Sequence, residues 1–211
     1  MSDGTFDYVR EPQAIYAASV AAIRESCDVS SLPGAMQGIA LRIAHAAGDS
    51  AAIAGLDWSD GAAEAGIAAL KAGAPVLADA RMVAEGVIRS ALPANNRVIC
   101  TLGLGSVAGN AARGGTTRSA AAVELWPEFL SGAVVAIGNA PTALFRLLQG
   151  LAAGWPKPAL IVGMPVGYIG AAESKSALSG LAPAPFIVLT GQRGGSAIAA
   201  ATVNALSRAA S

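Results

Sequence analysis

The sequence contains very few of the residues on which metal sites and disulfide frameworks depend. Among its 211 residues are a single histidine, His45, and two cysteines, Cys27 and Cys100, whose separation matches no metal-ligand spacing. Structural and catalytic zinc sites need several such ligands, and small secreted proteins depend on paired cysteines. We therefore expect no metal site, no disulfide and a reduced, cytoplasmic protein.

Charged residues and long apolar runs are also scarce. Charged residues make up 13% of the chain and the formal net charge is zero, so nucleic-acid binding has no electrostatic basis. No apolar run reaches the roughly 18 residues that suggest a membrane span. The N-terminus is polar and acidic, unlike a secretory signal. We expect a soluble protein that binds neither nucleic acid nor a membrane.

Alanine and glycine supply much of the 54% hydrophobic content, while aromatic residues reach only 5%. This composition favours closely packed elements over a bulky aromatic core, and the length suits a single domain over residues 1–211. The N-terminal part is predicted to be helical over 12–27 and 35–47. A third helix, capped by Ser59 or Asp60, is expected to end near Gly73.

Short apolar runs alternate with helical patterns after residue 74. The runs cover 75–78, 97–102, 133–137, 159–162 and 186–189, and the helical patterns cover 82–88, 118–130, 141–152, 170–179 and 195–208. Continuous apolar runs of this length are typical of strands buried on both faces. The alternation predicts an α/β fold with a mostly parallel, five- or six-stranded, doubly wound sheet.

Glycine-rich segments follow the last three predicted strands. They are Gly138-Asn139-Ala140-Pro141-Thr142, Gly163-Met164-Pro165-Val166-Gly167 and Gly191-Gln192-Arg193-Gly194-Gly195-Ser196. The carboxyl ends of parallel strands form the edge where open α/β sheets bind ligands, although each segment alone also fits an ordinary turn. The glycine-rich stretch 105–119 is expected to be a long loop, either a lid or a disordered tether.

His45 lies in a predicted helix with Arg42 and Asp49 at spacings of three and four, so the three side chains share a face. An imidazole can exchange a proton near neutral pH, although a lone histidine is also compatible with a purely structural role. The chain has no nucleophile elbow, Walker loop or complete dinucleotide fingerprint. These residues favour acid catalysis on an anionic ligand.

Several segments resemble the precorrin-8X methylmutase family. In the family's order they are Arg42-Ile43-Ala44-His45-Ala46-Ala47-Gly48-Asp49, Asp79-Ala80-Arg81-Met82-Val83, Thr117-Arg118-Ser119-Ala120-Ala121, Ala136-Ile137-Gly138-Asn139-Ala140-Pro141-Thr142-Ala143-Leu144, Val162-Gly163-Met164-Pro165-Val166-Gly167, Ala172-Glu173-Ser174-Lys175 and Gly191-Gln192-Arg193-Gly194-Gly195-Ser196. The similarity spans roughly residues 8–206. The chain departs from the family's pattern at 102–105 and 50–53.

The resemblance implies an isomerase of cobalamin biosynthesis. It would move a methyl group from C-11 to C-12 of the macrocycle, a formal 1,5-sigmatropic shift that converts precorrin-8X to hydrogenobyrinate. It implies no separate cofactor, and a homodimer that binds an acidic tetrapyrrole near the subunit interface. Action on the cobalt-containing analogue and a non-catalytic tetrapyrrole carrier remain alternatives. A nucleotide-binding oxidoreductase is disfavoured by the missing fingerprint.

The resemblance also implies site residues. His45 takes the catalytic role, protonating a ring nitrogen. The expected substrate-binding residues combine family positions with the crevice loops: Ser19, Arg42, Thr117, Arg118, Asn139 and Arg193. The arginines would pair with substrate carboxylates in bidentate fashion.

Overall fold

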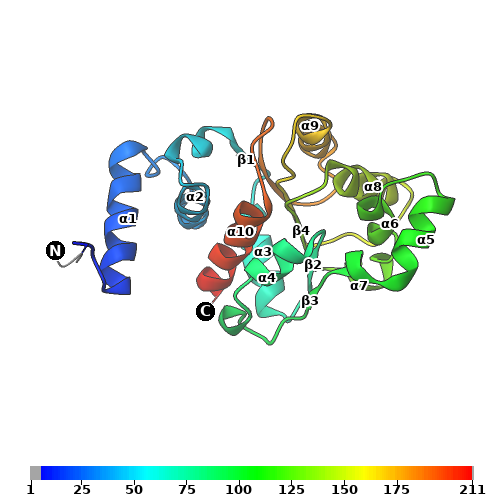
Figure 1. The fold of residues 1–211 in the computed structure, drawn as a ribbon, viewed down its shortest axis with the longest axis horizontal. Helices are drawn as coiled ribbons and strands as arrows, with labels where there is room; N and C mark the ends of the chain where they lie inside the picture. The colour runs from blue at the N-terminus through cyan, green and yellow to red at the C-terminus, as the bar shows by residue number, and fades with distance from the viewer. Residues whose placement is uncertain (1–5, 211) are drawn as a thin grey trace, which may run out of the picture.

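The computed structural model describes residues 6–210 and has a six-stranded sheet at its centre (Figure 1). The strand order is β1-β6-β5-β4-β2-β3, and every neighbouring pair is parallel except β1 with β6. The strands are β1 (Leu56–Trp58), β2 (Val76–Ala78), β3 (Val98–Ile99), β4 (Val134–Ile137), β5 (Leu160–Gly163) and β6 (Phe186–Leu189). The predicted mostly parallel α/β sheet is confirmed. The single unit expected over 1–211 includes residues 1–5 and 211, which lie outside the described residues.

Helices cover both faces of the sheet. One face packs against α2 (Gly34–Ala47), α3 (Ala62–Lys71), α4 (Arg81–Gly86) and α10 (Ser196–Ala210), and the other against α6 (Arg118–Val123), α7 (Pro127–Leu130), α8 (Pro141–Ala152) and α9 (Ala171–Leu181). No helix within the described residues is long and apolar enough to cross a bilayer.

The two-sided core follows from the alternation of side chains along buried strands. In β4, Val134 and Ala136 join the core on the α10 side, whereas Val135 and Ile137 join the core on the α8 side. Small residues allow the helices to approach closely. A Cβ at Gly66 of α3 would lie 2.6 Å from Cδ2 of Leu160, so a larger residue there would force the Leu160 side chain to shift.

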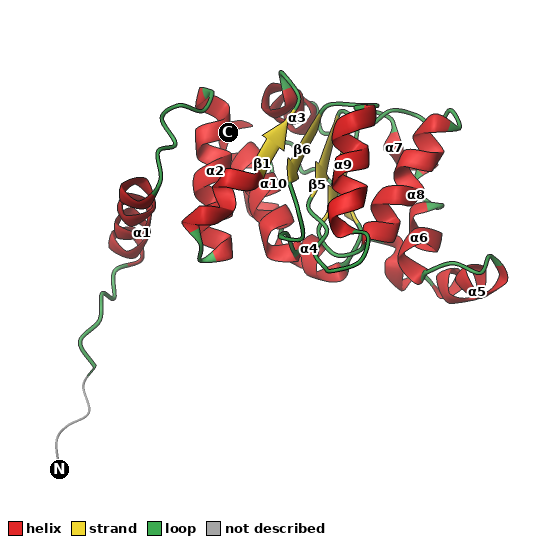
Figure 2. Cartoon of the chain, turned by 90° about the horizontal axis from the view of Figure 1, so that it is seen from above, coloured by secondary structure: helices red, strands yellow, loops and turns green. Residues whose placement is uncertain are grey.

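Helix α1 (Pro12–Ser26) stands apart from the layers, as Figure 2 shows. None of its residues is buried, although Val20 and Ile23 pack against a small cluster that includes Leu41 of α2. The helix begins with a proline, and the Glu11 side chain accepts N–H bonds from Gln13 and Ala14. Local capping therefore stabilises α1 more than tertiary packing does.

Several local predictions were wrong. The predicted loop 105–119 contains a helix, α5 (Gly105–Arg113), because Val107 and Ala111 bury one face against α6. The predicted helix 118–130 is broken into α6 and α7, with Pro127 opening the second. Strand β1 was not expected. Neither Ser59 nor Asp60 caps α3, since the Ser59 hydroxyl instead accepts the Phe186 N–H.

Candidate active site

The candidate site lies where the winding of the sheet reverses. Neighbouring strands β2 and β4 lead into helices on opposite faces, α4 on one and α8 on the other. The chain diverges above their carboxyl ends and leaves a crevice, which is where open α/β sheets bind ligands. The crevice was predicted from the glycine-rich segments after the strands, and the structure places parts of all three segments there.

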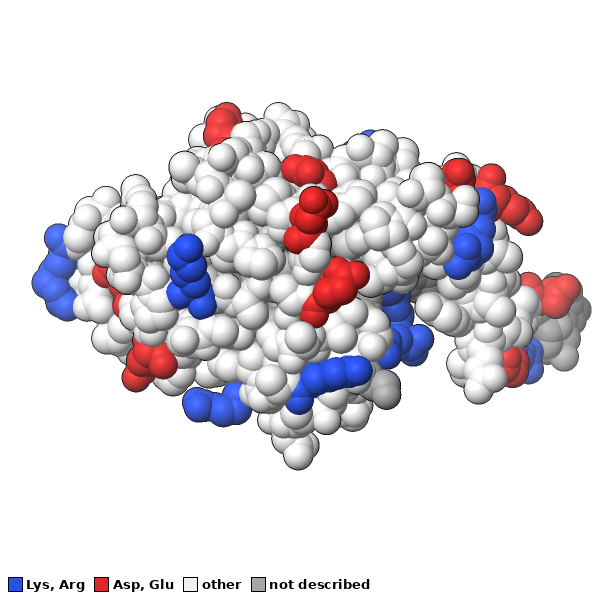
Figure 3. All heavy atoms as spheres, turned by 180° about the vertical axis from the view of Figure 1, so that it is seen from behind, with Lys and Arg blue, Asp and Glu red and all other residues white. Residues whose placement is uncertain are grey.

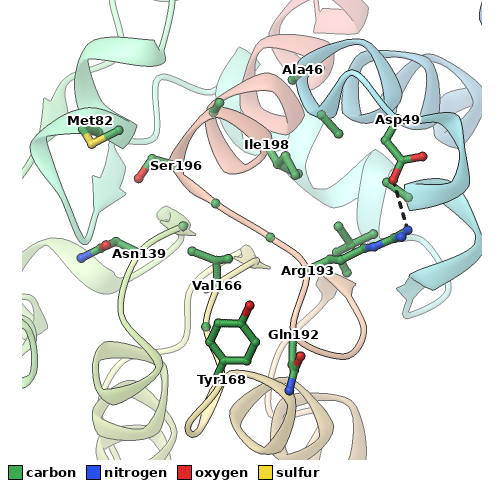
Figure 4. A pocket seen from close by; sticks show the side chains of 18 residues that line it. Ala46, Asp49, Met82, Asn139, Val166, Tyr168, Gln192, Arg193, Ser196 and Ile198 are labelled. Atoms are coloured by element: carbon green, nitrogen blue, oxygen red, sulfur yellow. Dashed lines mark ion pairs between the residues drawn. The ribbon is translucent and has the colours of Figure 1, made fainter.

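The crevice is a cleft with a volume of about 730 Å³, within the usual range for small-molecule sites. Met82 and Asn139 lie on one side, and Asp49 and Arg193 lie on the opposite side, with Val166 and Tyr168 between them (Figure 4). Its other lining residues are Ala46, Ala47, Ala52, Gly138, Gly167, Leu189, Gln192, Gly194, Gly195, Ser196, Ala197 and Ile198. The lining is mostly apolar or backbone, with a few polar groups that could orient a ligand.

A buried carboxylate holds one wall of the cleft. Asp79 directly follows β2 and is 2% exposed. Its Oδ1 accepts the Gly138 N–H at 2.9 Å, and its Oδ2 accepts the N–H groups of Asn139 and Ala140 at 3.0 and 2.8 Å. Burial raises the pKa of the Asp79 carboxyl, and the backbone N–H bonds oppose that rise. The result is a turn before α8 whose backbone is fixed, with Asn139 at the cleft.

A buried amine holds the opposite wall. Lys175 of α9 is 1% exposed, and its Nζ donates to the Arg193 carbonyl oxygen at 2.6 Å. Burial lowers the pKa of Lys175 to about 8. The Arg193 guanidinium, which is exposed, lies 3.3 Å from Oδ2 of Asp49 on the same side of the cleft. This ion pair contributes little to stability because both side chains are solvated, so a ligand carboxylate can replace Asp49 at small cost.

His45 lies beside the cleft, immediately before the lining residues Ala46 and Ala47. It is exposed on the last turn of α2, which ends at Gly48 in the left-handed conformation. The imidazole meets the Tyr16 ring edge-on, with the centroids 6.1 Å apart. The predicted helical face shared by Arg42, His45 and Asp49 was wrong for Asp49, because α2 ends at Ala47 and Asp49 is extended. Asp49 pairs with Arg193, and within residues 6–210 no carboxylate lies within ion-pair distance of His45.

Two further predicted site residues lie near His45. The Arg42 guanidinium lies over the Tyr16 ring at 5.2 Å. Ser19 is one helical turn after Tyr16 on α1 and is half-buried, and its hydroxyl donates to the Ile15 carbonyl at 2.8 Å. Arg42 and His45 therefore meet on the Tyr16 ring at the α1–α2 contact, near the Asp49 end of the cleft, and Ser19 lies one turn further along α1.

The remaining predicted pair, Thr117 and Arg118, lies beyond the opposite end. Both are exposed at the start of α6, where the Thr117 hydroxyl caps the helix by accepting the Ala120 N–H. The Thr117 and Thr142 hydroxyls are 2.8 Å apart, and Thr142 is three residues after Asn139. Thr117 and Arg118 do not line the cleft of this chain but adjoin its Asn139 wall.

Asp79 and Lys175 were not predicted as site residues. Both carried a signal in the sequence. Asp79 is a charge directly after a buried apolar run, and Lys175 falls on the same helical face as Ala171 and Leu178, which are buried. Their hydrogen bonds to distant backbone groups could not be inferred from this pattern.

Comparison with known proteins shows the family of the chain. The family model described as precorrin-8X methylmutase matches residues 14–209. A precorrin-8X methylmutase of Pseudomonas aeruginosa is 55% identical over 95% of this chain and 97% of that protein. A cobalt-precorrin-8 methylmutase of Priestia megaterium is 33% identical over 93% and 88%. The crystal structure of precorrin-8X methylmutase from Thermus thermophilus superposes with a TM-score of 0.84 at 37% identity, covering 93% of this chain and 97% of that one. The chain belongs to the precorrin-8X methylmutase family.

Proposed function

We propose that this protein, as one methylmutase domain over residues 1–211, converts precorrin-8X to hydrogenobyrinate by moving a methyl group from C-11 to C-12. One observation carries the proposal beyond family membership. A row of polar and basic residues supports it: His45 directly precedes the lining residue Ala46, Arg193 and Asn139 line the cleft, and Thr117 and Arg118 adjoin its Asn139 wall. The single imidazole of the chain stands at one end of this row.

The proposed role of His45 is that of an acid. Its proton would pass to a ring nitrogen of the macrocycle, which withdraws electron density and eases migration of the methyl group. General acids of this kind contribute roughly 10²–10⁴-fold to rate. The exposed position of the ring beside the cleft supports this role, because the imidazole is accessible to solvent and directly precedes the lining residue Ala46.

The proposed substrate contacts divide into two kinds. Arg42, Arg118 and Arg193 would pair with side-chain carboxylates of the tetrapyrrole. Ser19, Thr117 and Asn139 would donate or accept hydrogen bonds at the ring periphery. Because the migration is intramolecular, positioning and one proton suffice, and the proposal needs no additional cofactor.

We propose the cobalt-free macrocycle as the substrate. The identity to the relative named precorrin-8X methylmutase is 55%, against 33% for the relative named cobalt-precorrin-8 methylmutase. Incubation with each macrocycle in turn, followed by absorbance, tests this choice. Faster conversion of the cobalt-containing compound would reverse it.

We also propose that the protein acts as a homodimer in the cytoplasm. The segment leading into α1 and α1 itself expose Phe6, Tyr8, Val9 and Ile15, which are between 45% and 84% accessible. Apolar side chains gathered on one exposed arm are typical of a surface that packs against another chain. Light scattering after gel filtration should give twice the mass of one chain, and cell fractionation tests the location.

The central test compares the native protein with His45→Ala. The native protein should develop the absorbance of hydrogenobyrinate from precorrin-8X. The variant should bind the product with similar affinity yet turn over about 10²–10⁴-fold more slowly. Glu64→Ala on the exposed side of α3 is the control and should retain full activity.

If the native protein binds the macrocycle but forms no product, a carrier function replaces the proposed one. Unchanged turnover in His45→Ala would remove the acid role.

A further inference from the structure

Two arginines from different elements meet on one aromatic ring. The Arg42 guanidinium of α2 lies 5.2 Å from the centre of the Tyr16 ring, and the Arg208 guanidinium of α10 lies 5.6 Å from it. His45 contacts the same ring by its edge. Tyr16 therefore gathers two cations and the proposed acid at the junction of three helices.

Neither arginine has a counter-ion within the described residues. The ion pairs of residues 6–210 are Arg89 with Glu85, Arg146 with Glu124 and Arg193 with Asp49. Two like charges held near one ring repel each other, and the ring face offsets only part of that cost. A carboxylate that pairs with one of the two guanidinium groups would lower this cost, so the cluster is suited to bind an anion.

The surface beside the cluster is open. Figure 3 shows a hollow between α1 and the main body, and Lys or Arg side chains lie on its wall. Arg208 is exposed near the end of α10, and His45 is exposed at the end of α2. A ligand group can therefore approach Arg208 and His45 from solvent, with the half-buried Arg42 beside them on the Tyr16 ring.

We propose that Arg208, together with Arg42 and the Tyr16 ring, forms a subsite for one side-chain carboxylate of the acidic tetrapyrrole. This inference rests on the proposed function, since it assigns a further contact to that substrate. A carboxylate held here lies beside the imidazole of His45. Arg208 thus adds affinity for this edge of the macrocycle without taking part in proton transfer.

The test is the steady-state kinetics of Arg208→Gln with precorrin-8X. Loss of one charge-assisted bond should raise KM roughly tenfold, while kcat changes less than about twofold. Arg208→Lys keeps the charge but loses the paired N–H donors of the guanidinium, so its KM should lie between those of the native protein and Arg208→Gln. Arg24→Gln is the matched control, because Arg24 is an exposed arginine of α1 without an ion pair in the described chain. Circular dichroism and thermal melting verify the fold of each variant.

Product binding separates this inference from the proposed function. Titration with hydrogenobyrinate should show the same loss of affinity in Arg208→Gln, whether or not the native protein catalyses the reaction. If precorrin-8X is not converted but this loss is seen, the proposed function fails and the subsite stands. If conversion is normal and Arg208→Gln matches the native protein in KM and product affinity, the subsite is overturned. The subsite is also overturned if the variant dissociates into monomers while each monomer binds product normally, because Arg208 would then pair with a partner chain.

Discussion

Asp79 and Lys175 are charged side chains that the fold buries in order to hold backbone, one on each side of the cleft. Asp79 accepts the N–H groups of the turn before α8, and Lys175 donates to the carbonyl of Arg193. A buried charge is costly unless hydrogen-bonded. Hydrogen bonds to the segments that carry Asn139 and Arg193, two proposed substrate contacts, offset the cost of burying each charge. The same bonds therefore stabilise the fold and fix the shape of the cleft.

Lys175 should give the protein a measurable pH dependence. Its folded pKa of about 8 lies below the ordinary value of 10.5. Between these values the unfolded chain holds a proton that the folded chain has released, so stability rises with pH in this window. Relative to Lys175→Met, the native free energy of unfolding should rise by roughly 2 kcal/mol between about pH 7 and about pH 10. Urea unfolding at several pH values in this range measures the free energy of unfolding. If it varies with pH equally in the native protein and in Lys175→Met, the lowered pKa of Lys175 is contradicted.

At the scale of elements, the cleft depends on the close approach of α10 to the end of β4. A Cβ at Gly138 would lie 2.8 Å from Cα of Ser196 and 2.9 Å from the Gly195 carbonyl oxygen. Both contacts are to backbone, so no side-chain rotation relieves them. Glycine at this position is therefore a requirement of packing rather than of turn conformation.

Gly138→Ala should push the turn at Gly138 away from the segment at Gly195 and Ser196. We expect a loss of roughly 1–3 kcal/mol, as for other overpacked sites, and a melting temperature lower by about 2–4 °C for each kcal/mol. Turnover should fall more than stability alone explains, because Asn139 is displaced. Gly180→Ala in α9 is the control, since a Cβ there meets nothing within 4 Å. Equal melting temperatures and activities for the two variants would rule out the steric requirement.

At the scale of the whole molecule, α1 is an arm that carries site residues without contributing much to the core. It has no buried residue, and Val20, Ile23 and Cys27 pack only partly against their cluster. The arm nevertheless carries Ser19 and Tyr16, which stand at the His45 end of the row. Stability and substrate binding should therefore respond very differently to its removal.

A chain lacking residues 1–26 should keep its fold. Loss of a few half-buried contacts predicts a melting temperature lower by roughly 2–8 °C, whereas affinity for hydrogenobyrinate should fall at least about tenfold with the contacts of Ser19 and Tyr16 removed. Calorimetry and absorbance titration measure the two effects. A truncated chain that binds as tightly as the native protein would show that α1 takes no part in the site.

The α/β class, the mostly parallel sheet and the crevice at the carboxyl ends of its strands followed from the sequence, because buried strands and helices leave distinct apolar periods. Strand β1 was missed since three half-buried residues carry no such period, and their pairing with β6 comes from contacts more than a hundred residues away. Helix α5 was missed because its glycines oppose helix formation locally, while burial of Val107 and Ala111 favours it.

The family, the fold class and the candidate residues could be predicted from the sequence, since those depend on local pattern and order. Which of these residues meet became known from the packing of the elements. This packing joins Asp49 to Arg193, sets Arg42 and Arg208 on one ring, and leaves Thr117 and Arg118 beyond the Asn139 wall. Such contacts depend on helix packing and on side-chain reach between elements distant in the chain, and neither is encoded in spacing along the sequence.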